Sequence, residues 1–95
     1  MKLSDIAIIK TNFPDADFWL IRRGSKDTVG KPVKEFATES IGIKVTTDAV
    51  LPDYLYYIFM HLHLKGVWKQ LSTGSLNLVH ITTKMVRDIP VGSTK

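Results

Sequence analysis

Cationic side chains gather between residues 22 and 34 of this 95-residue chain, and their chemistry favours a polyanionic partner. They are Arg22, Arg23, Lys26, Lys31 and Lys34, interleaved with glycine, serine and threonine. Each lysine or arginine that neutralises a phosphate releases counterions, and arginine is the side chain that most often reads guanine in the major groove of DNA. The stretch therefore predicts a loop that follows a nucleic-acid backbone, with Lys31 and Lys34 as phosphate anchors.

The same charges have a plainer interpretation. Acidic neighbours at Asp27, Glu35 and Glu39 would pair with them in a solvated loop that binds nothing. The net charge of +4 does not separate the two interpretations, because many small domains carry a few net charges for solubility alone. Both interpretations stay open on the charges alone.

A second polar segment, 73–80, offers short hydrogen-bonding side chains. Ser75, Asn77 and His80 could meet phosphates or base edges, and asparagine can address adenine through two hydrogen bonds. The alternative is a plain connection between two helices, with the apolar residues of the segment packed into the core.

Metal and cofactor chemistry are not expected. His61 and His63 are two residues apart, so on a helix they point roughly 200° away from each other and cannot share an ion. His80 stands alone in the sequence, and a chain with no cysteine cannot complete a thiolate zinc site. We expect structural or surface histidines, no metal and no cofactor.

Catalytic motifs are also missing, so we expect a protein that is not an enzyme. No serine lies in a G-x-S-x-G context, and Gly24-Ser25-Lys26 lacks the spacing of a phosphate-binding P-loop. The Asn/Asp-Pro-Pro-aromatic motif of a DNA methyltransferase is not present. The early aspartates are too scattered to indicate a metal-dependent nuclease.

Composition predicts one ordinary soluble domain. Hydrophobic residues make up 44% and charged residues 23% of the chain, as in typical globular proteins. Zero cysteines fit a reducing compartment. The longest apolar run, near 55–64, is broken by histidines, so no bilayer span is expected. The first residues show no signal-peptide pattern, and a cytoplasmic location is the default expectation.

Strand signals dominate the first half of the chain. Residues 3–11 are expected to form one helical turn that feeds a strand. The aromatic and β-branched run at 18–21 predicts a buried strand that ends at the two arginines. Residues 24–35 are expected to form a mobile basic loop. Isoleucine and valine alternate with glycine and lysine over 40–46, as in a half-buried strand.

Helix signals dominate the second half. Pro52 and Asp53 suit the first turn of a helix. An apolar stripe at i, i+3, i+4 and i+7 spacing follows, made of Leu55, Ile58, Phe59 and Leu62. A second stripe is expected to continue it past Gly66, a residue that would kink or divide the helix, through Leu64, Val67, Trp68 and Leu71.

The end of the chain carries capping signals. Gly74 is placed where a left-handed helix cap is expected. Thr82 is a candidate N-cap of a last helix, with Ile81 and Val86 as its hydrophobic staple. Pro90 would stop this helix, and Val91 would add a short strand. Together these signals predict a small single-domain α+β fold over residues 1–95, with a twisted sheet from the N-terminal half and helices from the C-terminal half.

Four short motifs occur in an order that resembles a known family. They are the Lys-Leu-Ser-Asp-Ile-Ala entry at 2–7, the Leu-Pro-x-Tyr-Leu helix start at 51–55, the glycine-serine loop and Ile-Thr helix start within 74–82, and Ile-Pro at 89–90. In this order they resemble a target-recognition domain of the specificity subunit of type I restriction–modification systems. The long helices that bind the methyltransferase subunits in that family are not found here, so the resemblance is to a short or partial form.

The resemblance implies a non-catalytic module that reads double-stranded DNA and directs a methyltransferase or restriction complex to its site. Its partners would be DNA and either a methyltransferase subunit or a second copy of the chain. The alternative is a protein-interaction module of a restriction–modification complex, or of a phage or mobile-element complex, that does not touch DNA and uses the helix surface over 54–68. Aromatic residues exposed there would favour a protein partner, although Tyr54, Tyr56 and Tyr57 are expected to pack at the edge of the core.

Overall fold

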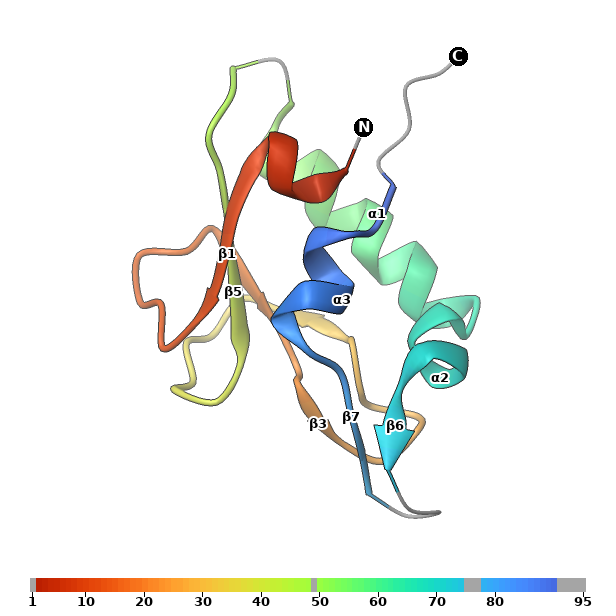
Figure 1. The fold of residues 1–95 in the computed structure, drawn as a ribbon. Helices are drawn as coiled ribbons and strands as arrows, with labels where there is room; N and C mark the ends of the chain where they lie inside the picture. Colours follow the sequence, from red (N-terminus) through yellow and green to blue (C-terminus); the bar gives the residue numbers. More distant parts are fainter. Residues whose placement is uncertain (1, 49, 75–77, 91–95) are drawn as a thin grey trace.

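Alternating apolar residues build a four-stranded antiparallel sheet in the first half of the chain (Figure 1). The computed structural model describes residues 2–48, 50–74 and 78–90. The strands of this sheet are β1 (Ala7–Thr11), β2 (Phe18–Leu20), β4 (Pro32–Val33) and β5 (Ile41–Val45), in the order β1-β5-β2-β4. A 3-10 turn, η1 (Leu3–Asp5), leads into β1, as expected from the sequence.

Strand β5 is central because both of its edges are paired. Along β1 the register runs from Ala7 opposite Val45 to Thr11 opposite Ile41, and β2 pairs with the other edge. Ile41 and Ile43 are fully buried and Lys44 is exposed, which confirms the strand predicted over 40–46.

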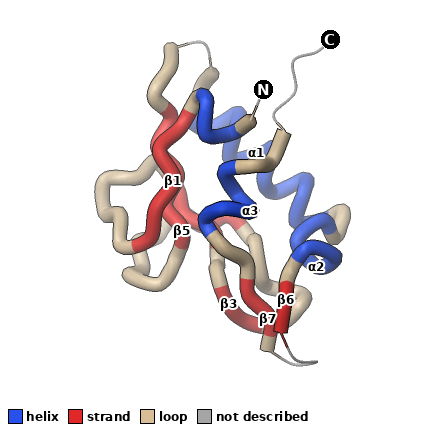
Figure 2. Tube along the Cα trace, viewed as in Figure 1, coloured by secondary structure: helices blue, strands red, loops and turns tan. Residues whose placement is uncertain are grey.

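Helix α1 (Pro52–Leu64) packs on this sheet and begins at Pro52, as predicted. Its Leu55 and Phe59 are fully buried, and the ring of Phe59 lies 5.9 Å from that of Phe18 in β2. Figure 2 shows α1 to the right of β1 and β5, with the short helix α3 (Thr83–Arg87) in front of α1 in this view. None of the helices in the described ranges is long and apolar enough to cross a membrane.

Gly66 divides the helical region, as expected. Its φ of +79° is left-handed and separates α1 from α2 (Val67–Leu71). Because this turn changes the direction of the chain, the second apolar stripe does not continue the first. Trp68 is fully buried, whereas Leu64 is 75% exposed and Leu71 is also exposed, so the prediction of one continuous stripe was wrong.

A second antiparallel sheet corrects the expectation that strands belong to the N-terminal half alone. It consists of β3 (Arg23–Gly24), β7 (Val79–His80) and β6 (Thr73–Gly74), in the order β3-β7-β6. Gly74 therefore lies in a strand and is not a helix cap. A Cβ at Gly74 would lie 2.4 Å from the carbonyl oxygen of Leu78, so the close approach of β6 to the chain before β7 requires glycine.

The segment 24–35 is not a free loop, because backbone hydrogen bonds tie it to the core. The amide of Gly30 donates to the carbonyl of Ile21 at 2.7 Å, and the amide of Ile21 donates to the carbonyl of Lys31 at 3.1 Å. Val29 and Pro32 are buried. Short stretches of β3 and β4 also lie within this segment.

The last helix follows its predicted signals. The amide of Met85 donates to the Thr82 hydroxyl at 3.2 Å, which confirms Thr82 as the N-cap of α3. Ile81 and Val86 are both fully buried. The helix ends at Arg87 before Pro90, and Pro90 forms an isolated antiparallel bridge with Lys2. The strand predicted at Val91 lies outside the described residues.

Candidate nucleic-acid interface

The β3-β7-β6 sheet brings together the two polar segments that the sequence singled out. In its register Arg23 lies opposite His80, and His80 lies opposite Thr73. The amide of Ile81 donates to the carbonyl of Arg22 at 2.9 Å and extends the contact by one residue. Figure 1 shows β3, β7 and β6 side by side at the lower end of the molecule. Two segments far apart in the sequence therefore form one surface.

Glu39 holds both arginines of this surface. The Arg23 guanidinium donates to the Glu39 carboxylate at 2.8 Å, and Nε of Arg22 donates to the Glu39 carbonyl at 3.0 Å. Both members of the Arg23–Glu39 ion pair are exposed, with side-chain exposures of 48% and 72%, and exposed pairs are weak. The prediction that Glu39 pairs with the cationic stretch is confirmed. The arginines are nonetheless oriented and open to solvent.

Asp27 and Lys34 pair outside the cationic stretch. Asp27 makes an ion pair at 3.3 Å with Lys69 of α2, so its predicted pairing with the stretch itself was wrong. Lys34 pairs with Asp53 at 3.0 Å, and its ammonium lies 4.6 Å from the centre of the Tyr56 ring. Lys34 is therefore directed toward the start of α1, apart from the two arginines.

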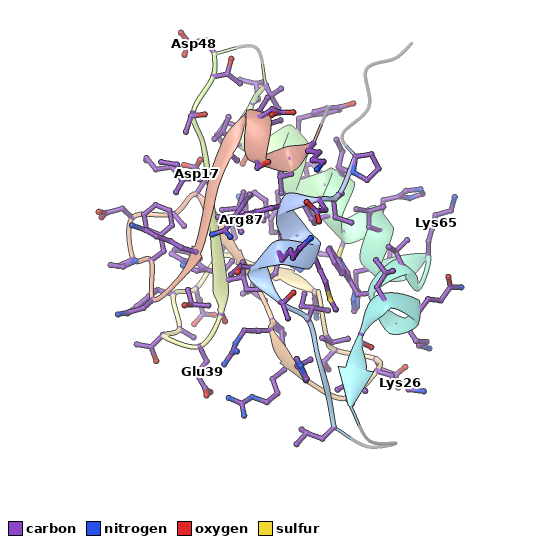
Figure 3. The ribbon with its side chains drawn as sticks, viewed as in Figure 1. Asp17, Lys26, Glu39, Asp48, Lys65 and Arg87 are labelled. Atoms are coloured by element: carbon purple, nitrogen blue, oxygen red, sulfur yellow. The ribbon has the colours of Figure 1, made fainter. Side chains whose placement is uncertain are left out.

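Lys26 and Lys31 keep exposed side chains and make no ion pair within the part of the chain that the structure describes. Lys26 lines a cavity of about 200 Å³ together with residues from the junction of α1 and α2. In Figure 3, Lys26 and Glu39 lie on opposite sides of the β3-β7-β6 sheet. Lys26 therefore lies apart from the arginines that Glu39 contacts, and Lys34 lies at the start of α1, so the five cations do not form one cluster.

The polar residues of the second segment are placed only in part. His80 is exposed in β7, next to Arg23. Ser75 and Asn77 lie outside the described residues. Val79 is buried, as the plain interpretation of the segment required, but Leu78 is exposed. The segment lies between α2 and α3, as that interpretation expected, but its ends form strands β6 and β7.

The histidines of α1 lie apart from each other. His61 is exposed on α1, and His63 is partly buried with Nδ1 3.3 Å from the carbonyl oxygen of Val29. No group of three or more metal-ligating side chains occurs within residues 2–48, 50–74 and 78–90.

The outer face of α1 departs from the expected packing. Tyr56 packs against the core, with its ring edge-on to Phe18 at 5.6 Å and its hydroxyl donating to the carbonyl of Pro32 at 3.4 Å. Tyr54 and Tyr57, by contrast, are 62% and 69% exposed. The prediction of core-edge packing holds for Tyr56 and was wrong for the other two tyrosines.

An ion pair at the end of α3 shifts the pKa values of both its members. The hydrogen bond from Lys84 to Asp88, 2.8 Å long, raises the pKa of Lys84 and lowers the pKa of Asp88 from their ordinary values. Lys2 adds a second cation 3.6 Å from Asp88. This pair ties the end of α3 to the start of the chain and takes no part in the β3-β7-β6 surface.

Comparison with known proteins does not assign the chain to a family. No protein-family model matches the chain, and neither a curated protein nor a solved structure matches it.

Proposed function

We propose that this chain is a non-catalytic module that binds double-stranded DNA in a sequence-specific way. It would act as the target-recognition domains of type I specificity subunits do, directing a methyltransferase or restriction complex to its site. The pairing of β3 with β7 carries this proposal, because it joins Arg22 and Arg23 to the segment that ends at His80. A surface that sets Arg23 opposite His80, with Arg22 next in the chain, offers hydrogen-bonding groups of the kind that contact base edges and phosphates.

The shape of this surface also fits DNA. A two-stranded β-ribbon is one of the two elements that the major groove admits, and the paired strands β6 and β7 would supply such a ribbon at one end of the molecule. We assign base or phosphate contacts to Arg22, Arg23, Lys26, Ser75, Asn77 and His80. Lys31 serves as a phosphate anchor. Lys34 contributes least, because Asp53 already pairs with its ammonium.

The double variant Arg22→Ala with Arg23→Ala tests the proposal. Each phosphate contact contributes about 0.9 to the slope of log affinity against log salt, so we expect the slope to fall by about two units. The measurement is fluorescence anisotropy on a short duplex over about 50–200 mM salt. Lys2→Ala with Lys84→Ala is the matched control, because it removes the same charge around Asp88. If the salt slope falls equally in the two double variants, the effect is due to net charge alone and not to contacts made by the arginines.

A selection on random duplex tests sequence reading separately. Enrichment of one short motif is the expected result. Binding without any enriched motif would contradict sequence-specific reading and leave only general attraction to DNA.

The outer face of α1 favours a second function, a protein-interaction module. Tyr54, Tyr57 and Leu64 are all more than half exposed on one helix. Tyrosine is enriched in binding hot spots, and contiguous exposed apolar surface marks interaction sites. The partner would be a methyltransferase subunit or a second copy of the chain. Failure to bind any duplex, with retained binding to a methyltransferase subunit, would favour this function over the first.

A further inference from the structure

A small polar cavity lies where the turn after β3 meets the junction of α1 and α2. It is lined by Lys26 and Asp27 from the turn, His63 and Leu64 from the end of α1, Gly66, and Lys69 from α2. We refer to it as the junction pocket. Its volume of about 200 Å³ lies below the range of roughly 300–1,000 Å³ typical of sites for drug-sized ligands and cofactors. The junction pocket therefore fits a small polar group better than a whole cofactor.

The charges of the lining residues favour an anion as the ligand of the junction pocket. Lys26 makes no ion pair with any described residue, and Lys69 is paired only with Asp27, whose side chain is 85% exposed. The lining thus carries two cations against one exposed carboxylate. A metal ion is disfavoured, because two of the four polar side chains are ammonium groups, which have no lone pair to donate.

The ring of His63 is oriented by a contact with the backbone. Its Nδ1 lies 3.3 Å from the carbonyl oxygen of Val29. Since a carbonyl only accepts hydrogen bonds, Nδ1 carries a proton.

We propose that the junction pocket holds a phosphate of the DNA backbone, with Lys26 and Lys69 as its two cations. This rests on the proposed DNA-binding function and extends the interface to α1 and α2. The connection is short, because Lys26 follows β3 by two residues and β6 begins two residues after α2 ends. A duplex seated on the β3-β7-β6 sheet thereby passes next to the pocket, and Figure 1 shows α2 directly above β6.

Matched single variants test the pocket in DNA binding. Lys26→Ala and Lys69→Ala should each lower the slope of log duplex affinity against log salt by about one unit. Each variant loses the same single phosphate contact, because the two lysines share it. Because they share it, the double variant should lose little more than either single variant. Lys65→Ala is the control: Lys65 leaves the same junction in another direction (Figure 3) and does not line the pocket. An equal loss in the Lys65 variant would overturn the proposal.

Asp27→Asn gives a test of opposite sign. This change removes the carboxylate from the lining and releases Lys69 from its ion pair, so duplex affinity should rise about two- to fivefold, the equivalent of a weak exposed pair. If the Asp27–Lys69 pair serves only to hold the turn on α2, Asp27→Asn would leave affinity unchanged or lower it. That outcome contradicts the proposal.

Inorganic phosphate separates failure of the pocket from failure of DNA binding. In an NMR titration at constant ionic strength, phosphate should shift the amides of Gly66 and Lys69, and the Lys26→Ala, Lys69→Ala double variant should abolish those shifts. If phosphate shifts these amides in a wild-type chain that binds no duplex, the pocket is an anion site but its ligand is not a DNA phosphate. A different result would contradict the anion site alone. In that case the chain binds duplex, phosphate causes no amide shifts, and the lysine variants keep the wild-type salt slope. The proposed DNA-binding function would be unaffected.

Discussion

Glu39 is the residue on which the arginine surface depends. It contacts Arg22 through its carbonyl and Arg23 through its carboxylate, so it orients both side chains while neutralising part of their charge. An arginine held in this way loses less conformational entropy on meeting a phosphate. In the proposed DNA complex the cost would be the displaced ion pair, and this cost would be small because the pair is exposed.

Replacing Glu39 by glutamine isolates that electrostatic cost. Glu39→Gln keeps the carbonyl contact with Arg22 and removes the charge, so duplex affinity should rise by about 1.4- to 5-fold, equivalent to roughly 0.2–1 kcal/mol. Glu35→Gln is the matched control, since Glu35 makes no ion pair within the part of the chain that the structure describes. Anisotropy at a fixed salt concentration measures both variants. A Glu39 variant that binds no tighter than the Glu35 variant would show that the pair does not compete with DNA.

Sequence patterns identified individual residues well where the cause was local. The N-cap Thr82 and the first-turn Pro52 follow from the chemistry of helix ends. Lys69 and His63 gave no such signal, because only the tertiary fold brings them to Lys26. The partners of Asp27 and Lys34 were not predictable for the same reason: acidic neighbours in the sequence are not the neighbours in space.

Gly30 fixes the turn that carries Lys26 and Lys31 against the helices. Its φ is +81°, and a Cβ built there would lie 2.0 Å from Cδ1 of Trp68. Trp68 is fully buried and stacks on Phe59 with ring centroids 6.2 Å apart. The turn, α2 and α1 therefore meet through one glycine and two stacked rings.

Two glycines with the same backbone geometry separate strain from packing. Gly30→Ala should destabilise the protein by about 2–5 kcal/mol, because it adds overpacking against Trp68 to the strain of a left-handed residue. Gly66→Ala should cost only about 1–2 kcal/mol, since its φ is +79° and no atom lies within 4 Å of the added Cβ. Urea unfolding followed by circular dichroism compares the two. Equal losses would contradict the close packing of Gly30 on Trp68.

Element prediction failed where the elements were shortest. The strand over Ile41–Val45 and the helix from Pro52 have enough residues to show their periods. Strands β3, β6 and β7 have two residues each, too few for any alternation to appear. Their pairing depends on contacts between distant segments, so the sheet that carries the candidate interface was the part of the fold that the sequence could not reveal.

On the scale of the whole molecule, two different surfaces serve the two candidate functions. The β3-β7-β6 sheet is cationic and polar, whereas the outer face of α1 is aromatic and apolar. The α1 residues that face inward, Leu55 and Phe59, belong to the core of the four-stranded sheet. Changes on the outer face of α1 should therefore leave the β3-β7-β6 surface intact.

The neutral double variant Tyr54→Gln with Tyr57→Gln tests this separation. Both side chains are exposed, so the fold should survive, and duplex affinity and salt slope should stay within about twofold of wild type because no phosphate contact is lost. Binding to a type I methyltransferase subunit, measured by calorimetry, should weaken at least tenfold if these tyrosines are hot spots, which cost at least about 2 kcal/mol when removed. The Arg22→Ala, Arg23→Ala variant should show the reverse pattern. A loss of duplex affinity in the tyrosine variant would mean that the outer face of α1 contacts DNA in addition to the end of α1 at the junction pocket, and the two functions would then not have separate surfaces.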